Sequence, residues 1–461
     1  MSAVLTPVRP ERRDEPDGLE PGGGAPGPGG DWPRTNRVLP WMIAGFLTML
    51  WLVPFDSIQV PVNLPFDSKL DRVALLAMAV LWIAVALAGG RAAPRLRFTG
   101  VHWALLAFVG VAVLSIIVNA DTLANLGELE LSIKQSGLLL TLTLFFFMVT
   151  SIVRPSEVRA FATFAIVLGC ITALGTLLEK RTGTNIFFLV AQKTLAGPFV
   201  VGPEPANDLF GRPMINGPTL HGLAVSTMLA FLLPIPLSRL LMGGESRRNR
   251  RLLLLSVALM FAGAIATDRK SAVVVPVVAL VILAVQRPRT TVRLLPWALA
   301  ILLAMPIVSP GSLGSLRGQL LPSRVTNDPS TTGRTADYPA VVPDVISHPI
   351  LGEGYGSYDW HTHRILDNQY LGLLIETGAV GVFALLVLFG AIAVVGRRAV
   401  TSRDASRAPP GLAATATAGA MVVATVLFDD FTYPQVPYVL LFVAALAVVV
   451  APDRARRTTR A

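Results

Sequence analysis

The sequence predicts an all-α polytopic membrane protein with about 12 transmembrane helices, and composition is the first observation behind this prediction. Of the 461 residues, 53% are hydrophobic and only 15% are charged, and the mean hydropathy is +0.60. A soluble globular domain carries about 25% charged residues, so a soluble enzyme, a secreted disulfide scaffold and a disordered chain are excluded. The single cysteine, Cys170, excludes an internal disulfide and any CxxC metal or redox site.

The second observation is the division of the chain into apolar segments. Each is roughly 16–25 residues long, which is enough to cross a bilayer when tilt is allowed. They form a transmembrane domain over residues 38–451, with a large outer loop at 310–369 before the tenth span. The predicted spans are 38–54, 72–89, 101–118, 136–153, 161–178, 219–237, 252–267, 271–286, 294–309, 371–395, 411–428 and 436–451.

The third observation is the placement of basic residues. With both termini in the cytoplasm, about 26 of the 39 lysines and arginines lie inside and about 13 outside, as the positive-inside rule requires. The formal charge of +10 is therefore explained by basic residues that orient the protein in the membrane, and nucleic-acid binding is excluded. Residues 1–37, which contain PGGGAPGPGG, are predicted to be a disordered cytoplasmic tail, and residues 452–461 a basic cytoplasmic tail.

Three arginines lie on the predicted outer face, where they do not contribute to the positive-inside signal that orients the protein. Arg212 lies in GRPMINGP before the sixth span, Arg269 in the short TDRKS turn, and Arg334 in STTGRTADYP of the large loop. The arginine fork suits phosphate oxygens, and a diphosphate needs several such donors. The alternative is that each arginine pairs with a loop acid or with the headgroups of membrane lipids.

The segment LDNQYLGLLIETGAVG opens the tenth span and places polar groups at the membrane boundary. Asp367 and Asn368 stand at the boundary itself, whereas Glu376 lies about two turns inside, where a carboxylate needs a partner. Gly378 and Gly381 would let another helix approach closely. The simpler interpretation makes Asp367 a helix N-cap, Glu376 a buried bridge to an arginine, and the glycines packing positions.

A glycine-alternating stretch, HPILGEGYGSYDWHTH, precedes that span and predicts irregular backbone close to another part of the chain. It is not a dinucleotide site, because no strand and helix alternate around it. His361 and His363 could be two metal ligands, but no third ligand nearby has suitable spacing, so no metal site is expected. His363 is the better candidate for a proton acceptor, since the ordinary histidine pKa near 6.5 suits a general base.

Taken in order, these motifs resemble the O-antigen ligase and O-antigen polymerase family of bacterial membrane proteins. The resemblance covers roughly residues 210–390. Its elements are Gly333-Arg334, the Pro-x-x-Gly-x-Gly pattern from Pro349 to Gly354, the Asn-x-Tyr-Leu pattern from Asn368 to Leu371, and the Glu-x-Gly-x-x-Gly pattern from Glu376 to Gly381. TDRKSA at 267–272 is similar to the Thr-x-Ser-Arg-Gly-Ala turn of the family.

The resemblance implies a glycan transferase of the cytoplasmic membrane that acts at its outer face. A glycan on a polyprenyl diphosphate would move onto a glycan or lipid acceptor, with no metal or nucleotide cofactor. The family arginines that hold the diphosphate correspond by position to Arg212 and Arg334, and less closely to Arg269. Asn368, Tyr370, Glu376, Gly378 and Gly381 would support the site, and Asp367 or His363 would take the acceptor proton.

One residue departs from the ligase pattern. The position before Asn368 is histidine in the ligases, whereas this chain has Asp367. The departure favours polymerase-type or otherwise divergent transfer. Two other hypotheses stay open: a transporter or flippase of a lipid-linked or anionic solute, and a catalytically inactive assembly partner.

Overall fold

The computed structural model describes residues 30–62, 67–90, 93–205, 207, 214–294, 296–297, 299–300, 329–358, 363–402 and 404–452, with backbone alone at 329–335. Nearly all of its regular structure is helical, apart from the two-residue strands β1 (Ile58–Gln59) and β2 (Val200–Val201), which pair antiparallel. The helices are α1 (Val38–Leu52), α2 (Leu70–Ala88), α3 (Gly100–Val118), α4 (Ala120–Leu126), α5 (Leu129–Ile152), α6 (Val158–Thr182), α7 (Ile186–Leu195), α8 (Gly222–Leu232), α9 (Pro234–Met242), α10 (Arg247–Ala266), α11 (Ser271–Gln286), α12 (Pro288–Thr291), α16 (Pro329–Ser347), α17 (Gln369–Val400), α18 (Ala408–Leu427) and α19 (Gln435–Val450). Short 3₁₀ turns η1 to η4 occupy Phe55–Ser57, Pro155–Glu157, Val292–Leu294 and Ala405–Arg407.

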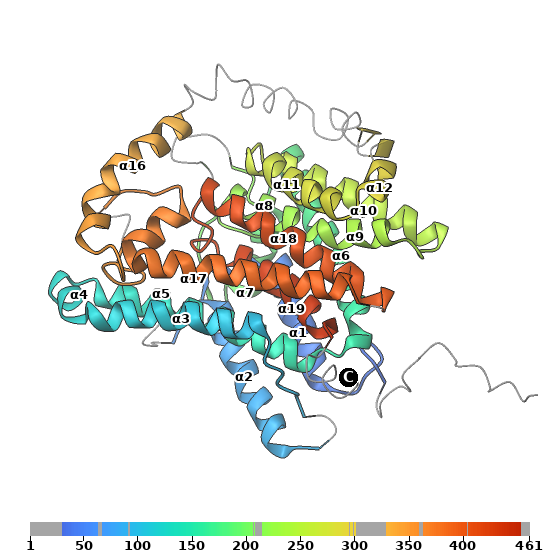
Figure 1. Ribbon diagram of the computed structural model, residues 1–461, viewed down its shortest axis with the longest axis horizontal. Coiled ribbons are helices and arrows are strands. Elements are labelled where there is room, and N and C mark those ends of the chain that lie inside the picture. The colour runs from blue at the N-terminus through green and yellow to red at the C-terminus, as the bar shows by residue number, and fades with distance from the viewer. Residues whose placement is uncertain are drawn as a thin grey trace, which may run out of the picture.

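The long helices form one bundle whose two ends differ in character (Figure 1). We call the end where α1, α3, α6, α10 and α18 begin the basic end, because the short arginine-rich connections lie there. We call the other end the loop end, which carries α4 and α16 at the left of Figure 1. Every functional candidate of the sequence analysis that the structure describes belongs to the loop end.

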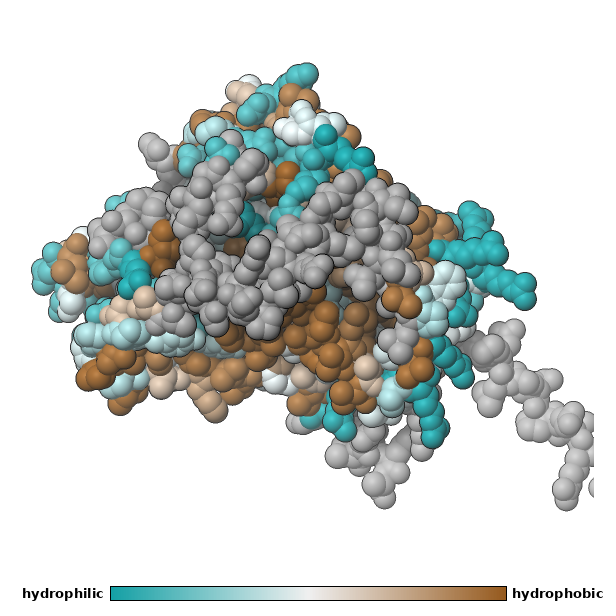
Figure 2. Space-filling view, turned by 90° about the horizontal axis from the view of Figure 1, so that it is seen from above, coloured by the Kyte–Doolittle hydropathy of each residue, from teal (hydrophilic) through white to brown (hydrophobic). Residues whose placement is uncertain are grey.

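Among the described residues, eight helices are long and apolar enough to cross a membrane, and the chain is a mostly helical polytopic membrane protein. Hydrophobic side chains line one edge of the face in Figure 2, and hydrophilic residues gather toward its left and right ends. Apart from 294–309, each predicted span coincides with a described helix, three of which (α1, α11 and α19) have only 15 or 16 residues. The total of twelve stays a prediction, because residues 301–309 lie outside the described part.

The centre of the bundle is α19, whose 16 residues are all buried. It packs against α5, α8, α17 and α18, so no face of it is left for lipid. Beside it α17 and α18 cross closely at two glycines. A Cβ on Gly396 would lie 2.6 Å from the Gly411 carbonyl oxygen, and one on Gly411 would lie 2.4 Å from the Gly396 oxygen. Small residues at a crossing let helix backbones touch, which is how helices associate where water supplies no driving force.

The tenth predicted span, α17, is broken one-third of the way along. Gly378 has φ 63° and ψ −166°, which is not helical. The break frees the Ala379 and Val380 N–H groups, whose helical acceptors would be the carbonyls of Ile375 and Glu376. Backbone groups inside a bilayer must find other partners, so the break requires a second segment to satisfy them.

The segment Pro349–Gly354 supplies these partners. The Ala379 N–H donates to the Pro349 carbonyl at 3.0 Å and the Val380 N–H to the Ile350 carbonyl at 3.3 Å. In return, the Glu353 N–H donates to the Ile375 carbonyl at 2.9 Å and the Gly354 N–H to the Glu376 carbonyl at 3.0 Å. Both i→i−4 bonds lost at the break are thus replaced by bonds to this segment.

From α3, Ser115 and Asn119 reinforce the junction. The Ser115 hydroxyl lies 2.7 Å from both the Leu351 and the Glu376 carbonyl oxygens, and the Asn119 amide donates to the Gly352 oxygen at 3.0 Å. The approach is close: a Cβ on Gly352 would lie 2.3 Å from the Glu376 carbonyl carbon. The irregular backbone that the glycine spacing predicts is therefore a plug inserted into a broken helix. We call Pro349–Gly354 the plug.

The structure changes two boundaries expected from the sequence. Residues 30–37 of the predicted tail pack on the domain, where the Trp32 ring stacks on Phe161 at 4.4 Å and its backbone N–H donates to Glu157. The folded domain therefore starts before Val38, because a buried tryptophan contributes apolar area that a polar tail lacks. The outer loop 310–369 contains the 19-residue helix α16, whereas its residues 310–328 lie outside the described part.

Replacing Gly378 with alanine should destabilise the protein by at least ~2 kcal/mol. A side chain at positive φ costs roughly 1–3 kcal/mol, and its Cβ would lie 2.3 Å from the Ile350 carbonyl carbon in the plug. Gly372→Ala is the matched control, because that glycine is helical and a Cβ there meets nothing within 4 Å. Thermal unfolding in detergent should show a lower Tm for Gly378→Ala alone. Equal behaviour of both variants would contradict the plugged break.

Candidate active site

The N-terminus of α17 begins with a side-chain cap. Asn368 Oδ1 accepts from the Tyr370 N–H at 3.0 Å and the Leu371 N–H at 3.4 Å, so the N-cap is Asn368 and not Asp367. The Tyr370 hydroxyl donates to the Val422 carbonyl of α18 at 3.1 Å, and Gln369 Oε1 accepts from the Phe431 N–H at 2.9 Å. These bonds fix the start of α17 and therefore the position of Asp367, which lies just before the N-cap.

Helix α16 is held over this terminus by polar and apolar contacts. Arg364 Nε lies 2.7 Å from Asp337 Oδ1, and the Asn368 amide lies 3.5 Å from the Tyr338 hydroxyl. Val341 of α16 packs in a small apolar cluster with Leu366 and with Ile375 of α17. Arg334 belongs to α16 and lies one helical turn before Asp337 and Tyr338, so its backbone is carried to the same part of the loop end.

The two proposed proton acceptors have different surroundings. His363 Nε2 lies 3.2 Å from Glu128 Oε1 at the start of α5, and its ring stacks on Tyr358 with centroids 4.7 Å apart. A carboxylate on one ring nitrogen orients the histidine ring. Asp367 is half-buried and faces the α18–α19 connection, within electrostatic reach of Asp429 and Tyr433.

Glu376 stands just before the helix break, where backbone N–H groups donate to its side chain. Its carboxylate accepts from the N–H groups of Gly356 and Tyr358, which follow the plug. The expected bridge to an arginine is thus replaced by these backbone donors. Gly378 is the break itself, and a Cβ on Gly381 would meet Thr377 of the same helix rather than a neighbouring helix. These positions shape the backbone beneath Asp367.

Arg269 reaches the same end from the turn between α10 and α11. A Cβ on Gly222, the first residue of α8, would lie 3.5 Å from Arg269 Nε, so the guanidinium lies against the start of α8. Both this arginine and Asp367 lie within electrostatic reach of Tyr433: burial raises the pKa of its phenol, the carboxylates of Asp429 and Asp367 raise it further, and Arg269 opposes them. A cation and a candidate base therefore both act on one tyrosine.

His221, the N-cap of α8, completes this polar group. Its Nδ1 accepts from the Leu223 N–H at 3.2 Å, and its ring lies 5.5 Å from that of Tyr433. We call His221, Arg269, Asp367, Asp429 and Tyr433 the loop-end cluster. It joins four helix ends that are distant in sequence.

The acids of the α18–α19 connection were not among the residues predicted for the site. Asp429 accepts from the Thr432 hydroxyl, while no residue in the described part of the chain donates a hydrogen bond to either carboxylate oxygen of the fully buried Asp430. Burial raises the pKa of Asp429, and burial together with Asp429 raises that of Asp430 well above its ordinary value. Two adjacent acids between apolar spans, in VLFDDFTYPQVP, were the signal that could have found them.

Glu179, near the end of α6, is a second residue that the sequence analysis missed. Its two carboxylate oxygens accept from the N–H groups of Asn216 at 2.7 Å and Gly217 at 2.8 Å. The Asn185 amide donates to the Gly217 carbonyl at 2.8 Å. These bonds fix the chain at the end of the GRPMIN motif. Arg212 itself lies outside the described residues, as does His361.

The structure thus brings Arg269, Asp367, Asn368 and Tyr370 to one end of the bundle, with the backbone of Arg334 carried there by α16. His363 belongs to the same end but pairs with Glu128. In the described ranges, no three His, Cys, Asp or Glu side chains are grouped as metal ligands would be.

Comparison with known proteins agrees with this geometry. Residues 255–386, from α10 to the first half of α17, match the family model described as O-antigen ligase. Residues 255–386 belong to the O-antigen ligase family. No curated protein matches the chain.

The match over residues 255–386 suggests a membrane enzyme of the glycan-transferring type. The matched region contains Arg269, Arg334, Asp367 and the plugged break of α17. His221 and the connection at 428–434 lie outside it, so the loop-end cluster combines family and flanking residues.

Asp430→Asn should stabilise the fold increasingly as pH rises. The folded state keeps this carboxyl neutral above its ordinary pKa of 3.8, whereas the unfolded chain releases the proton. Wild-type stability therefore falls as pH rises above that value, and asparagine removes this loss. The Tm difference between the variant and wild type should grow by a few °C from about pH 4 to about pH 8, at roughly 2–4 °C per kcal/mol.

Asp404→Asn is the control, because the pKa of this carboxyl is shifted in the opposite direction. Hydrogen bonds from Ser406 and Arg407 lower the pKa of Asp404, so its contribution is present above the ordinary aspartate value and lost as pH falls. Its replacement should lower Tm slightly at neutral pH. A Tm difference for Asp430→Asn that is independent of pH would contradict the neutral buried carboxyl.

Proposed function

We propose that the protein transfers a polyprenyl-diphosphate-linked oligo- or polysaccharide onto a glycan or lipid acceptor at the outer face of the cytoplasmic membrane. The observation that supports the proposal is that Arg269 at the start of α8 and Asp367 at the start of α17 lie at the same end of the bundle, within the segment that matches the O-antigen ligase family. A cation for the leaving group and a base for the acceptor are the two groups that the reaction needs.

The arginines would hold the donor diphosphate. As the bond between the anomeric carbon and the diphosphate oxygen breaks, the leaving group gains negative charge, and preorganised cations stabilise that charge. Arg269 at the start of α8, Arg334 on α16 and Arg212 before α8 are the proposed donors. The start of α8 adds the positive end of its helix dipole, which also favours anions.

Asp367 would act as the base. The acceptor hydroxyl attacks the anomeric carbon, its oxygen forms the new glycosidic bond, the Asp367 carboxylate takes its proton, and the polyprenyl diphosphate leaves with the bonding electrons. Asn368, Tyr370 and the plug hold Asp367 at the end of a rigid half-helix. His363, oriented by Glu128, is the alternative acceptor of the proton.

The membrane orientation of the proposal follows from charge. The short arginine-rich connections lie at the basic end, which we assign to the cytoplasm by the positive-inside rule. The loop-end cluster, α16 and the plug then face the outside. Lipid-linked glycans displayed on the outer leaflet would reach the cluster without crossing the bundle.

Asp367→Asn and Arg334→Ala should abolish transfer in cells that lack the wild-type gene. Loss of a general base costs about 10²–10⁴ in rate, so polyprenyl-diphosphate-linked glycan should accumulate on the outer face while the mature polymer disappears. Lipid extraction and polymer analysis measure both. Asp121→Asn and Lys193→Ala, exposed residues of α4 and α7 at the loop end, remove the same charges and should restore the polymer.

Two outcomes would contradict the proposal. Full restoration of polymer by both site variants would remove Asp367 and Arg334 from the chemistry. Precursor trapped on the inner face would instead indicate a flippase.

Cysteine labelling should establish the orientation independently. Ser347→Cys, at the exposed end of α16, should react with an impermeant maleimide in intact cells. Ala405→Cys, exposed at the basic end, should react only after lysis. The native Cys170 lies in the middle of α6 and should stay unlabelled in both. The reverse pattern would place the cluster in the cytoplasm and contradict outer-face transfer.

A further inference from the structure

Helix α16 turns an apolar face outward at the loop end. Tyr338, Val342 and Ile346 are spaced four residues apart, which places them on one side of the helix. They are 50%, 48% and 70% exposed, and we call them the outer row. Single apolar residues on a protein surface need no explanation, whereas a row of them on one helix marks a surface that contacts something else.

The outer row is not needed to hold α16 on the bundle. The opposite face of the helix does this, since Val341 packs in the apolar cluster with Leu366 and Ile375, and Asp337 is paired with Arg364. Val341 and Asp337 are buried. A helix that is apolar on two sides usually has both sides covered. The outer row therefore calls for an apolar environment of its own.

The outer row continues into the lipid-facing surface of α17. Ile350 of the plug follows Ile346 by four residues and is also exposed. Its carbonyl accepts from the Val380 N–H at 3.3 Å, so it lies beside α17, where Val380 and Phe383 are exposed as well. Helix α17 is long and apolar enough to cross a membrane. Exposed apolar side chains thus follow one another from α16 across the plug to a membrane span.

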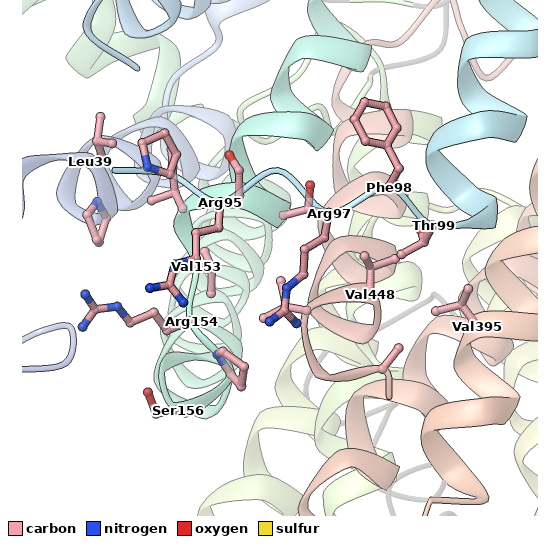
Figure 3. A pocket seen from close by; sticks show the side chains of 18 of the residues that line it. Leu39, Arg95, Arg97, Phe98, Thr99, Val153, Arg154, Ser156, Val395 and Val448 are labelled. Carbon is pink, nitrogen blue, oxygen red and sulfur yellow. The ribbon is translucent and has the colours of Figure 1, made fainter. Parts of the chain in front are cut away.

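The level of the plug in the bilayer follows from α17. At the basic end, Val395 of this helix lines one cavity with Arg95 and Phe98 (Figure 3). Basic and aromatic residues together mark a membrane boundary. From Val395 back to Gly378 a helix rises about 26 Å, which is close to the roughly 30 Å thickness of a bilayer core. The break and the plug therefore lie near the opposite boundary.

Two prolines limit how deep α16 can lie. Pro339 and Pro343 are inside the helix and exposed. A proline has no N–H, so the carbonyl groups of Thr335 and Pro339, four residues earlier, receive no bond from within the helix. Such groups need water or a polar headgroup, which the hydrocarbon core does not supply. The helix therefore suits the membrane interface better than the core.

We propose that α16 is an interfacial helix whose outer row is buried in the lipid surface at the loop end. Figure 1 shows α16 inclined to α17 rather than aligned with it, as such a helix requires. Interfacial helices bury an apolar face about 5–10 Å into the boundary between headgroups and acyl chains. The contact holds the backbone of Arg334, one turn before Tyr338, at the depth of the headgroups. It depends on the outward face of α16 and not on the proposed transfer reaction.

Spin labels on single cysteines test the proposal in the full-length protein in phosphatidylcholine nanodiscs. Val342→Cys and Ile346→Cys, each with Cys170→Ala, place the label in the outer row. Ser347→Cys is the matched control, because this exposed residue lies about 100° around the helix from Ile346. Oxygen concentrates in the bilayer and a nickel chelate in water. The ratio of oxygen to nickel accessibility should be several-fold higher at 342 and 346 than at 347.

Two results would overturn the contact. Labels at 342 and 346 that are as accessible to the nickel chelate as the label at 347 would show that the outer row faces water. Labels inaccessible to both reagents would show that protein, such as a second copy of the chain, covers it. Wild type gives a check without any substitution: a photoreactive phosphatidylcholine should cross-link to residues 336–350, and cross-links absent there would also overturn the contact.

Lipid charge gives an independent test of the apolar nature of the contact. Residues 336–350 contain no lysine or arginine, so the attraction depends on apolar area and not on anionic headgroups. The accessibility ratios at 342 and 346 should therefore be the same in nanodiscs of phosphatidylcholine and of phosphatidylglycerol. A contact that forms only with phosphatidylglycerol would contradict burial of the outer row.

Discussion

The loop end depends on the break in α17 at Gly378 and on the plug that fills it. Without the plug, the Ala379 and Val380 N–H groups and the Ile375 carbonyl of a membrane helix would lack these partners, and the Glu376 carbonyl would keep only the Ser115 hydroxyl. With it, the first nine residues of α17 form a rigid half-helix whose direction is set by Pro349–Gly354 rather than by the rest of the helix. Asn368 and Asp367 stand at the free end of that half-helix, so the geometry of the candidate site follows from the break.

The break also explains why two of the motifs in the resemblance, at 349–354 and 376–381, belong together. The Pro-x-x-Gly-x-Gly stretch and the Glu-x-Gly stretch are two sides of one contact: Gly352 lies against Glu376, and Gly378 lies against Ile350. Neither glycine can carry a side chain while the other segment stays in place. Glu376 closes the contact, because its carboxylate accepts from backbone N–H groups that follow the plug. The glycine motif of the plug, which resembles a binding loop, therefore mainly supports the backbone beneath the candidate site.

The loop end gathers groups of opposite charge. Arg269 and the carboxylates of Asp367 and Asp429 all lie within electrostatic reach of Tyr433, which suits a site that must bind a charged donor and release it. Asp430 differs from them, since it is buried and no described residue donates a hydrogen bond to its carboxylate.

The sequence by itself determined the helical membrane fold, its described spans and the family, because apolar length and motif order are properties of the chain alone. It also identified Asp367, Asn368 and Arg269 as residues of one end. Only the tertiary structure decided that Asn368 is the cap, that Gly378 breaks α17, and that Asp429 and Tyr433 join the cluster. The physical reason is that these outcomes depend on contacts between segments far apart in sequence. The break in α17 requires the plug to reach that helix, and the cluster requires the loop before α19 to reach the start of α8.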